Sequence, residues 1–149
     1  MTIWFDLDGT LADLYSVDNW LEDLINYRTR PCEEAQPMFR MCALARQLNV
    51  LRRKGIQIGI ISWCSKESTE EYSARITEAK KNWLAKHMPS VEWDEIHIVD
   101  YGTPKYTIGT GILFDDEERN RDEWNLRSGT AFAPENIVEI LKKLNREVM

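Results

Sequence analysis

Residues 3–10 read Ile3-Trp4-Phe5-Asp6-Leu7-Asp8-Gly9-Thr10, so three bulky apolar residues lead directly to two aspartates one residue apart. The apolar residues predict a short buried strand, and Asp8-Gly9 predicts a turn where this strand ends. Two carboxylates at one strand end repel each other, and a divalent cation such as Mg²⁺, which prefers hard oxygen ligands, would hold them together. With a metal bound, Asp6 can act as a nucleophile on phosphorus and Asp8 can transfer protons. The alternative is a strand end flanked by two solvated aspartates.

The rest of the 149-residue chain alternates between apolar runs and amphipathic segments. The runs predict further strands at residues 56–61, 96–99, 112–114 and 130–132. Helical patterns are expected at residues 16–27, 37–54, about 70–87, 117–124 and from 135 onward. This alternation predicts an α/β fold, a Rossmann-like three-layer parallel sheet with helices on both faces, in a single domain spanning residues 1–149.

Two amphipathic segments separate the first and second strands. Residues 16–27 have one apolar face that we expect to be buried, made of Val17, Trp20, Leu21, Leu24 and Ile25, and Arg30-Pro31 is expected to end this helix. A second helix is expected to begin at Pro37 and to end before Gly55, with Met38, Met41, Ala45, Leu48 and Leu51 inward. One crossover helix would suffice here, so we expect residues 12–36 to form a small helical cap above the strand ends.

Polar side chains follow four of the predicted strands, and ligands bind at the carboxyl ends of strands in an open parallel sheet. They are Asp6 and Asp8, then Ser62, then Lys105, then Asp115 and Asp116. Together they supply the nucleophile, the acidic metal ligands and the donors that a phosphoryl group needs. Each also has a plain structural alternative, because Ser62 can simply end a strand, Lys105 can be solvated, and Asp115-Asp116 can cap a helix.

The arrangement resembles the four motifs of the haloacid dehalogenase superfamily of phosphatases across residues 3–116. Asp6 and Asp8 match the DxDGT motif I, Ser62 motif II, Lys105 motif III and Asp115-Asp116 motif IV. The resemblance implies that Asp6 attacks phosphorus, and that Asp8 protonates the leaving oxygen and then activates water. It implies Mg²⁺ bound by the Asp6 carboxylate, the Asp8 carbonyl and Asp115, with Asp116 acting through water. Ser62, Lys105 and the amides of Leu7, Asp8 and Trp63 would bind the phosphoryl oxygens.

The superfamily's strand order places the third and fourth strands on opposite sides of the first, three strand spacings or about 14 Å apart. Residues 100–111, which connect these strands, are too rich in Gly, Pro and Thr for a helix. Extended, they reach about 40 Å, so a crossover without a helix can cover the distance.

The expected reaction is hydrolysis of a phosphomonoester, because the superfamily's phosphatases keep the second aspartate of motif I. Asn120, Trp124 and Gly129 after the double aspartate resemble small 5′-nucleotidases and deoxyribonucleotidases, which favours a nucleotide or another small phosphorylated metabolite as substrate. The alternative is that Trp124 packs a short helix and Gly129 turns the chain. Rival functions are a phosphatase for sugar phosphates or macromolecular phosphate, and a non-catalytic phosphate- and metal-binding module.

Net charge, hydropathy and cysteine spacing limit the kinds of partner that we expect for this chain. The formal net charge of −6 speaks against general nucleic-acid binding, which requires a basic face. No apolar run approaches membrane-spanning length, so no membrane partner is expected. Cys32, Cys42 and Cys64 lack the spacing of a zinc site and are expected to be reduced thiols in a cytoplasmic protein. The oligomeric state has no signal in the sequence.

Overall fold

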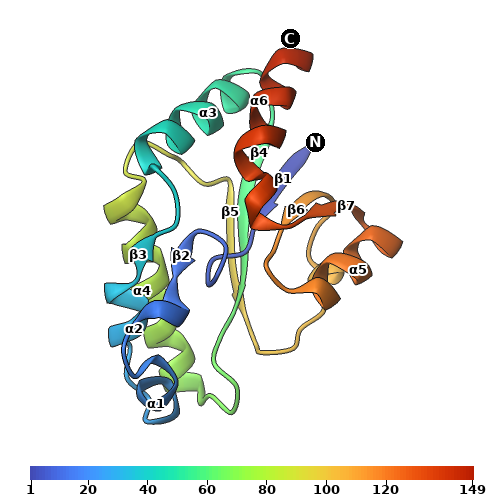
Figure 1. Ribbon diagram of the computed structural model, residues 1–149. Helices are drawn as coiled ribbons and strands as arrows, with labels where there is room; N and C mark the ends of the chain where they lie inside the picture. Colours follow the sequence, from blue (N-terminus) through green and yellow to red (C-terminus); the bar gives the residue numbers. More distant parts are fainter.

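The computed structural model describes residues 1–149 and is built around a parallel β-sheet with helices packed on it (Figure 1). The sheet contains five strands in the order β5-β4-β1-β6-β7. Their bounds are β1 (Thr2–Phe5), β4 (Gln57–Trp63), β5 (Glu95–Val99), β6 (Gly111–Phe114) and β7 (Gly129–Phe132). Every neighbouring pair in this sheet is parallel, which confirms the predicted α/β class.

The remaining elements are helices and one small antiparallel strand pair. The α-helices are α1 (Trp20–Ile25), α2 (Arg30–Glu34), α3 (Met41–Arg53), α4 (Glu70–His87), α5 (Glu118–Arg127) and α6 (Ile137–Glu147). Short 3₁₀ helices lie at η1 (Leu14–Ser16), η2 (Lys105–Thr107) and η3 (Pro134–Asn136). The small pair consists of β2 (Ala12–Asp13) and β3 (Gln36–Pro37). This pair joins the two ends of the predicted cap segment, whose role as a cap stays a prediction.

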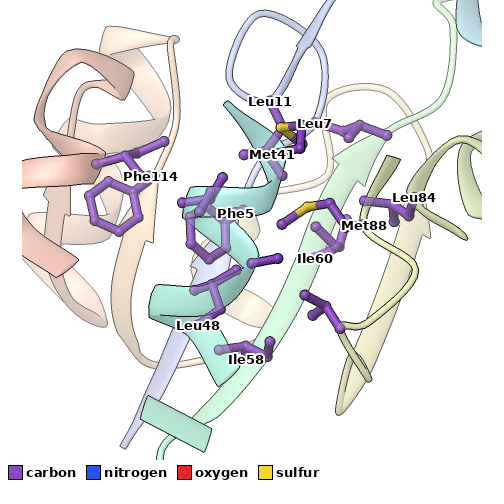
Figure 2. Packing of buried hydrophobic residues seen from close by; sticks show 14 of the residues in the cluster. Phe5, Leu7, Leu11, Met41, Leu48, Ile58, Ile60, Leu84, Met88 and Phe114 are labelled. Atoms are coloured by element: carbon purple, nitrogen blue, oxygen red, sulfur yellow. The ribbon is translucent and has the colours of Figure 1, made fainter. Parts of the chain in front are cut away.

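Side chains of successive β1 residues point to opposite faces of the sheet, as strand geometry requires. Ile3 and Phe5 belong to a large core that α3, α6 and the C-terminal part of α4 cover (Figure 2). Trp4 lies on the other face and packs with Leu113 and with Trp124 of α5. The sheet is therefore the middle layer of three, as the sequence predicts.

The connection from β5 to β6 contains no α-helix, as predicted. The two strands lie three positions apart in the sheet, on opposite sides of β1. Only η2 interrupts the extended connection, and the Trp4 indole Nε1 donates a hydrogen bond to the Thr110 carbonyl at 2.9 Å. The crossover therefore runs over the Trp4 face of the sheet and delivers Lys105 to its carboxyl edge.

The expected helix at residues 16–27 is wrong in extent and in burial. The chain forms η1 and then α1, which follows Asn19 in a left-handed conformation with φ 61°. Leu21 and Ile25, assigned to a buried face, are 54% and 66% exposed. Arg30-Pro31 opens α2 instead of ending a helix, because proline in the first turn loses no intrahelical hydrogen bond.

The second helix of this region begins at Met41, not at Pro37. Pro37 instead pairs with Ala12 in the two-stranded β2–β3 ladder, where an edge strand tolerates a residue without an N–H group. Met38 is consequently exposed, whereas the other four residues expected to face inward are buried. The helix ends before Gly55, which has a φ of +92°, as expected of a glycine that follows a helix.

The remaining predictions for the helices are confirmed more closely. The Thr69 hydroxyl caps α4 by accepting a hydrogen bond from the Tyr72 amide at 3.1 Å, and the helix ends at His87. Tyr72, Ile76, Ala79, Trp83 and Leu84, which repeat at helical spacing along α4, are all buried. None of the helices combines the length and the hydropathy that a membrane-spanning segment requires. Cys32, Cys42 and Cys64 are free thiols.

Candidate functional site

The carboxyl ends of β1, β4 and β6 lie side by side in the sheet, so the polar residues that follow them converge. A cavity of about 460 Å³ opens at this edge. All seven residues predicted for the site line it: Asp6, Asp8, Ser62, Trp63, Lys105, Asp115 and Asp116. The structure thus brings the whole predicted set together, while the chemical role of each residue stays a prediction.

Three carboxylates form an acidic cluster at the base of this cavity. One oxygen from each of Asp6, Asp115 and Asp116 lies within 4.8 Å of the other two. Asp6 and Asp115 are buried, whereas Asp116 remains exposed on one side. Burial and the negative charge of Asp6 raise the pKa of Asp115 to about 6 and that of Asp116 to about 8. Such crowded oxygen donors can hold a hard divalent cation.

Lys105 supplies a positive charge inside the acidic cluster. Its Nζ donates to Asp6 Oδ1 at 3.0 Å and to Asp115 Oδ2 at 2.7 Å. Burial opposes the ammonium charge, but the Asp6 and Asp115 carboxylates outweigh burial and raise the pKa of Lys105. The side chain is only 3% exposed and remains protonated. Lys105 therefore offsets part of the repulsion between the two aspartates.

Asp8 is not part of this acidic cluster, because its carboxylate is paired with a second buried lysine. Lys80 Nζ donates to Asp8 Oδ2 at 2.9 Å, to Ser62 Oγ at 2.8 Å and to the Trp63 carbonyl at 2.7 Å. Lys80 is 2% exposed; burial opposes its ammonium charge, but the charge and hydrogen bond of Asp8 together with Cys32 and Asp6 outweigh burial and raise the pKa of Lys80. The predicted role of the Asp8 carbonyl as a metal ligand remains a prediction.

Sequence reasoning missed Lys80, although a signal was available. Ile76, Lys80 and Leu84 are spaced four residues apart on α4, so the lysine lies on the same face as two buried apolar residues. A lysine on an inward face needs a buried acceptor. The end of β4 and the Asp8 turn supply that acceptor here.

Thr10 and Gly9 explain why the turn after Asp8 has its particular sequence. Thr10 Oγ1 donates to Asp6 Oδ2 at 3.1 Å and accepts from the Asp116 amide at 3.2 Å, so it joins the ends of β1 and β6. Gly9 has a φ of +77°, and a Cβ there would lie 2.3 Å from Asp116 Oδ2. Glycine is therefore required both by the backbone and by the close carboxylate.

Asp115 is held by groups from α5 as well as by Lys105. Its Oδ1 accepts from the Glu117 amide at 2.9 Å, and its Oδ2 accepts from Asn120 Nδ2 at 3.2 Å. Asp115 thus serves the start of the helix and the acidic cluster together. Trp124 is fully buried and its indole donates to the Gly111 carbonyl at 3.0 Å, which is the packing role given above as the alternative to the nucleotidase resemblance.

Aromatic and aliphatic residues form the sides of the cavity. Trp63 is held by a hydrogen bond from its indole Nε1 to the Thr103 carbonyl at 2.9 Å, and its ring lies 5.0 Å from that of Tyr101. Across the cavity stand Tyr15 and four residues of α1: Trp20, Leu21, Leu24 and Ile25. Leu21 and Ile25, which were expected to be buried, thus border the cavity largely exposed, whereas Val17 packs on the large core and Trp20 and Leu24 also pack on a smaller buried cluster.

Comparison with known proteins adds no family assignment. No protein-family model matches the chain, and no curated protein matches it. The chain has a parallel α/β fold and a largely buried acidic cluster that can bind a metal ion.

Proposed function

We propose that the chain is a Mg²⁺-dependent phosphatase of the haloacid dehalogenase type, which hydrolyses a nucleotide or another small phosphomonoester through a phosphoaspartate on Asp6. The supporting observation is the Lys105 ammonium between Asp6 and Asp115, inside an acidic cluster that opens into a cavity. A carboxylate that attacks an anionic phosphate must first have its charge offset. Lys105 and a bound cation would do this together.

The donor set of the acidic cluster fits Mg²⁺, which favours carboxylate oxygens. Asp6, Asp115 and Asp116 would hold the ion, and a cation would offset both the burial and the repulsion by Asp6 that raise the pKa values of Asp115 and Asp116. When bound, Mg²⁺ would neutralise phosphoryl charge and orient the phosphoryl group for attack.

Ser62 is prepared to donate a hydrogen bond to the phosphoryl group. An ammonium has no acceptor capacity, so in the contact between Lys80 and Ser62 the lysine must donate and the hydroxyl oxygen must accept. The hydroxyl proton of Ser62 is consequently free for a ligand oxygen. The backbone N–H groups of Leu7 and Asp8 make no hydrogen bond within the chain and offer two further donors beside Asp6.

The reaction then follows from the positions of the two aspartates. Asp6 forms a bond to phosphorus as the bond to the leaving oxygen breaks, and Asp8, which enters this step protonated, gives that oxygen its proton. Asp8 next takes a proton from a water molecule, whose oxygen attacks phosphorus and releases both phosphate and the Asp6 carboxylate. Lys80 would keep the Asp8 side chain in place throughout, since it binds one carboxylate oxygen and leaves Asp8 Oδ1 without a partner.

The proposal is tested with p-nitrophenyl phosphate, with Mg²⁺ or with EDTA, using the wild-type protein and Asp6→Asn. We expect release of p-nitrophenol only by the wild type with Mg²⁺, and at least about a thousandfold less by the variant. Asp122→Asn is the matched control, because Asp122 is an exposed carboxylate on α5 outside the cavity. Equal release in all samples would refute the enzymatic proposal and leave the non-catalytic module.

A further inference from the structure

The cavity has two chemically different parts. Its floor is the polar set Asp6, Asp8, Ser62, Lys80, Lys105, Asp115 and Asp116. Its wall is the apolar and aromatic set Tyr15, Trp20, Leu21, Leu24, Ile25, Trp63 and Tyr101. The floor accounts for a phosphoryl group and its cation. The wall has no part in that chemistry, and the volume of about 460 Å³ is in the range of cavities that hold a whole small ligand.

The wall begins directly beside the acidic cluster. A Cβ on Gly9 would lie 2.3 Å from Asp116 Oδ2 and 2.8 Å from Tyr15 Cε2, so the Tyr15 ring and the carboxylate share one small space. The Tyr15 and Trp20 rings meet edge to face with centroids 4.9 Å apart. The apolar surface thus continues from the acidic cluster through Tyr15 to Trp20 of α1.

Trp20 and Leu24 of α1 pack against a small buried cluster that includes Leu14 and Ile76, but folding does not explain Leu21 and Ile25. Leu21 and Ile25 lie one helical turn apart, and they are 54% and 66% exposed although they border the cavity. On the other side, Trp63 is fixed by Thr103 and lies over Lys105, with the Lys105 Nζ 5.5 Å from its ring centroid. A ligand between these two sides would meet aromatic rings and aliphatic side chains.

We infer that the wall binds an aromatic ring in the leaving group of the substrate, with Leu21 and Ile25 as specificity-determining residues; this inference rests on the proposed phosphatase function. An aromatic ring loses little on leaving water and gains contact with flat and branched apolar side chains. A polyhydroxylated leaving group against these side chains would lose hydrogen bonds to water, which only the remaining polar lining residues, Ser65, Lys66, Glu67, Glu117 and Asn120, could replace. The wall therefore favours aromatic over sugar-like phosphomonoesters.

Two matched substrate pairs test the inference. Benzyl phosphate and ethyl phosphate are both esters of simple alcohols and differ in the ring, and adenosine 5′-monophosphate and ribose 5-phosphate differ in the base. We expect about a tenfold higher kcat/KM for the ring-bearing member of at least one pair. The first pair tests whether the wall binds a ring close to the ester oxygen. The second pair tests whether it binds a ring that a sugar separates from the phosphate. Equal values within both pairs would overturn the inference.

Substitutions on α1 show whether the wall is responsible. The double variant Leu21→Ser and Ile25→Ser should lower the preference for the ring-bearing substrate about three- to tenfold. Both side chains are largely exposed, so the fold should tolerate the change, which thermal unfolding checks. Leu126→Ser is the control, because Leu126 is 83% exposed on α5 and does not border the cavity. An undiminished preference in the double variant would contradict the role of α1.

A binding measurement separates this inference from the phosphatase proposal. Calorimetry with Mg²⁺ compares benzylphosphonate with ethylphosphonate, neither of which can be hydrolysed as an ester. Tighter binding of benzylphosphonate without turnover of any ester would support the aromatic wall and refute the phosphatase. Mg²⁺-dependent hydrolysis with equal binding of the two phosphonates would support the phosphatase and refute the aromatic wall.

Discussion

The floor and the wall of the cavity differ in the burial and the hydrogen bonding of their side chains. On the floor, Lys80 and Lys105 are 2% and 3% exposed, and each donates hydrogen bonds to at least two acceptors. On the wall, Leu21 and Ile25 are more than half exposed and belong to the six-residue helix α1. The floor is therefore part of the folded core, whereas the wall is a surface added above it.

This difference suits two separate tasks, recognition of the phosphoryl group by the floor and recognition of the leaving group by the wall. Buried and paired charges such as Lys80 and Lys105 keep their positions, so they can help to recognise the one group that all phosphomonoesters share. Exposed apolar side chains contribute little to folding, so they can change with the leaving group at little cost to stability. The chain thereby keeps the proposed chemistry and the proposed selectivity on separate elements.

The largest effect should follow from removing the buried ammonium group of Lys80 from the floor. Lys80→Met leaves Asp8 without its counter-charge and Ser62 without the donor that orients it. We expect the free energy of unfolding to fall by about 2–3 kcal/mol, less than for a completely buried partner, since the Asp8 side chain is 20% exposed. We expect kcat/KM to fall about a hundredfold. Urea unfolding and steady-state kinetics measure the two effects.

Lys66→Met provides the comparison for this variant, because Lys66 is an exposed lysine at the same cavity without a hydrogen-bond partner. It should change stability by less than about 0.5 kcal/mol. The double variant Lys80→Met and Asp8→Asn should lose much less unfolding free energy than the sum of the two single variants, because the two groups are in direct contact. Additive losses would show that Lys80 does not act through Asp8.

Most of the floor was predictable because parallel strands bring their carboxyl ends to one edge. Asp6, Ser62 and Asp115 each follow an apolar run, and the topology places them together whatever the details of packing. Lys105 followed from the same rule, since it lies in the connection after β5. Lys80 was missed because it lies in the middle of a helix, where an isolated lysine is usually solvated.

The wall was predicted wrongly for a physical reason. Val17, Trp20, Leu21, Leu24 and Ile25 repeat at helical spacing, and this pattern is the same whether the face packs on a core or borders a cavity. The spacing of apolar residues shows that one face of the helix is apolar, but it does not show whether other side chains cover that face. The two-stranded β2–β3 pair was also missed, since strands of two residues carry too few side chains to show alternation.

A medium effect should follow from disturbing the acidic cluster through the backbone. Gly9→Ala would place a methyl group 2.3 Å from Asp116 Oδ2 at a φ of +77°. We expect a loss of about 2 kcal/mol in the free energy of unfolding and weaker Mg²⁺ binding, because Asp116 must move. Gly55→Ala is matched in conformation, with a φ of +92° and no atom within 4 Å of the added Cβ. It should lose only about 1 kcal/mol. Equal losses would mean that the carboxylate contact is unimportant.

The smallest effect concerns the ion pairs that connect Asp23 of α1 to Arg28 and to Arg30. Asp23 of α1 accepts hydrogen bonds from Arg30 Nε at 2.5 Å and from Arg28 Nη1 at 3.2 Å. The hydrogen bond from Arg30 is the main cause that lowers the pKa of Asp23 below its ordinary value. The folded state therefore prefers the ionised form. The resulting stabilisation is complete above about pH 4, near the pKa of an unfolded aspartate, and is lost as pH falls through the lower folded pKa.

Asp23→Asn should accordingly lower the melting temperature slightly at pH 7, and the difference from the wild type should shrink as the pH falls below 4. Asp18→Asn is the control, because Arg30 binds the carbonyl of Asp18 and not its carboxylate. That variant should match the wild type at every pH. Because α1 lies above the floor and not within it, neither variant should change Mg²⁺ affinity. A melting difference for Asp23→Asn that persists undiminished at pH 3 would assign the effect to packing instead of charge.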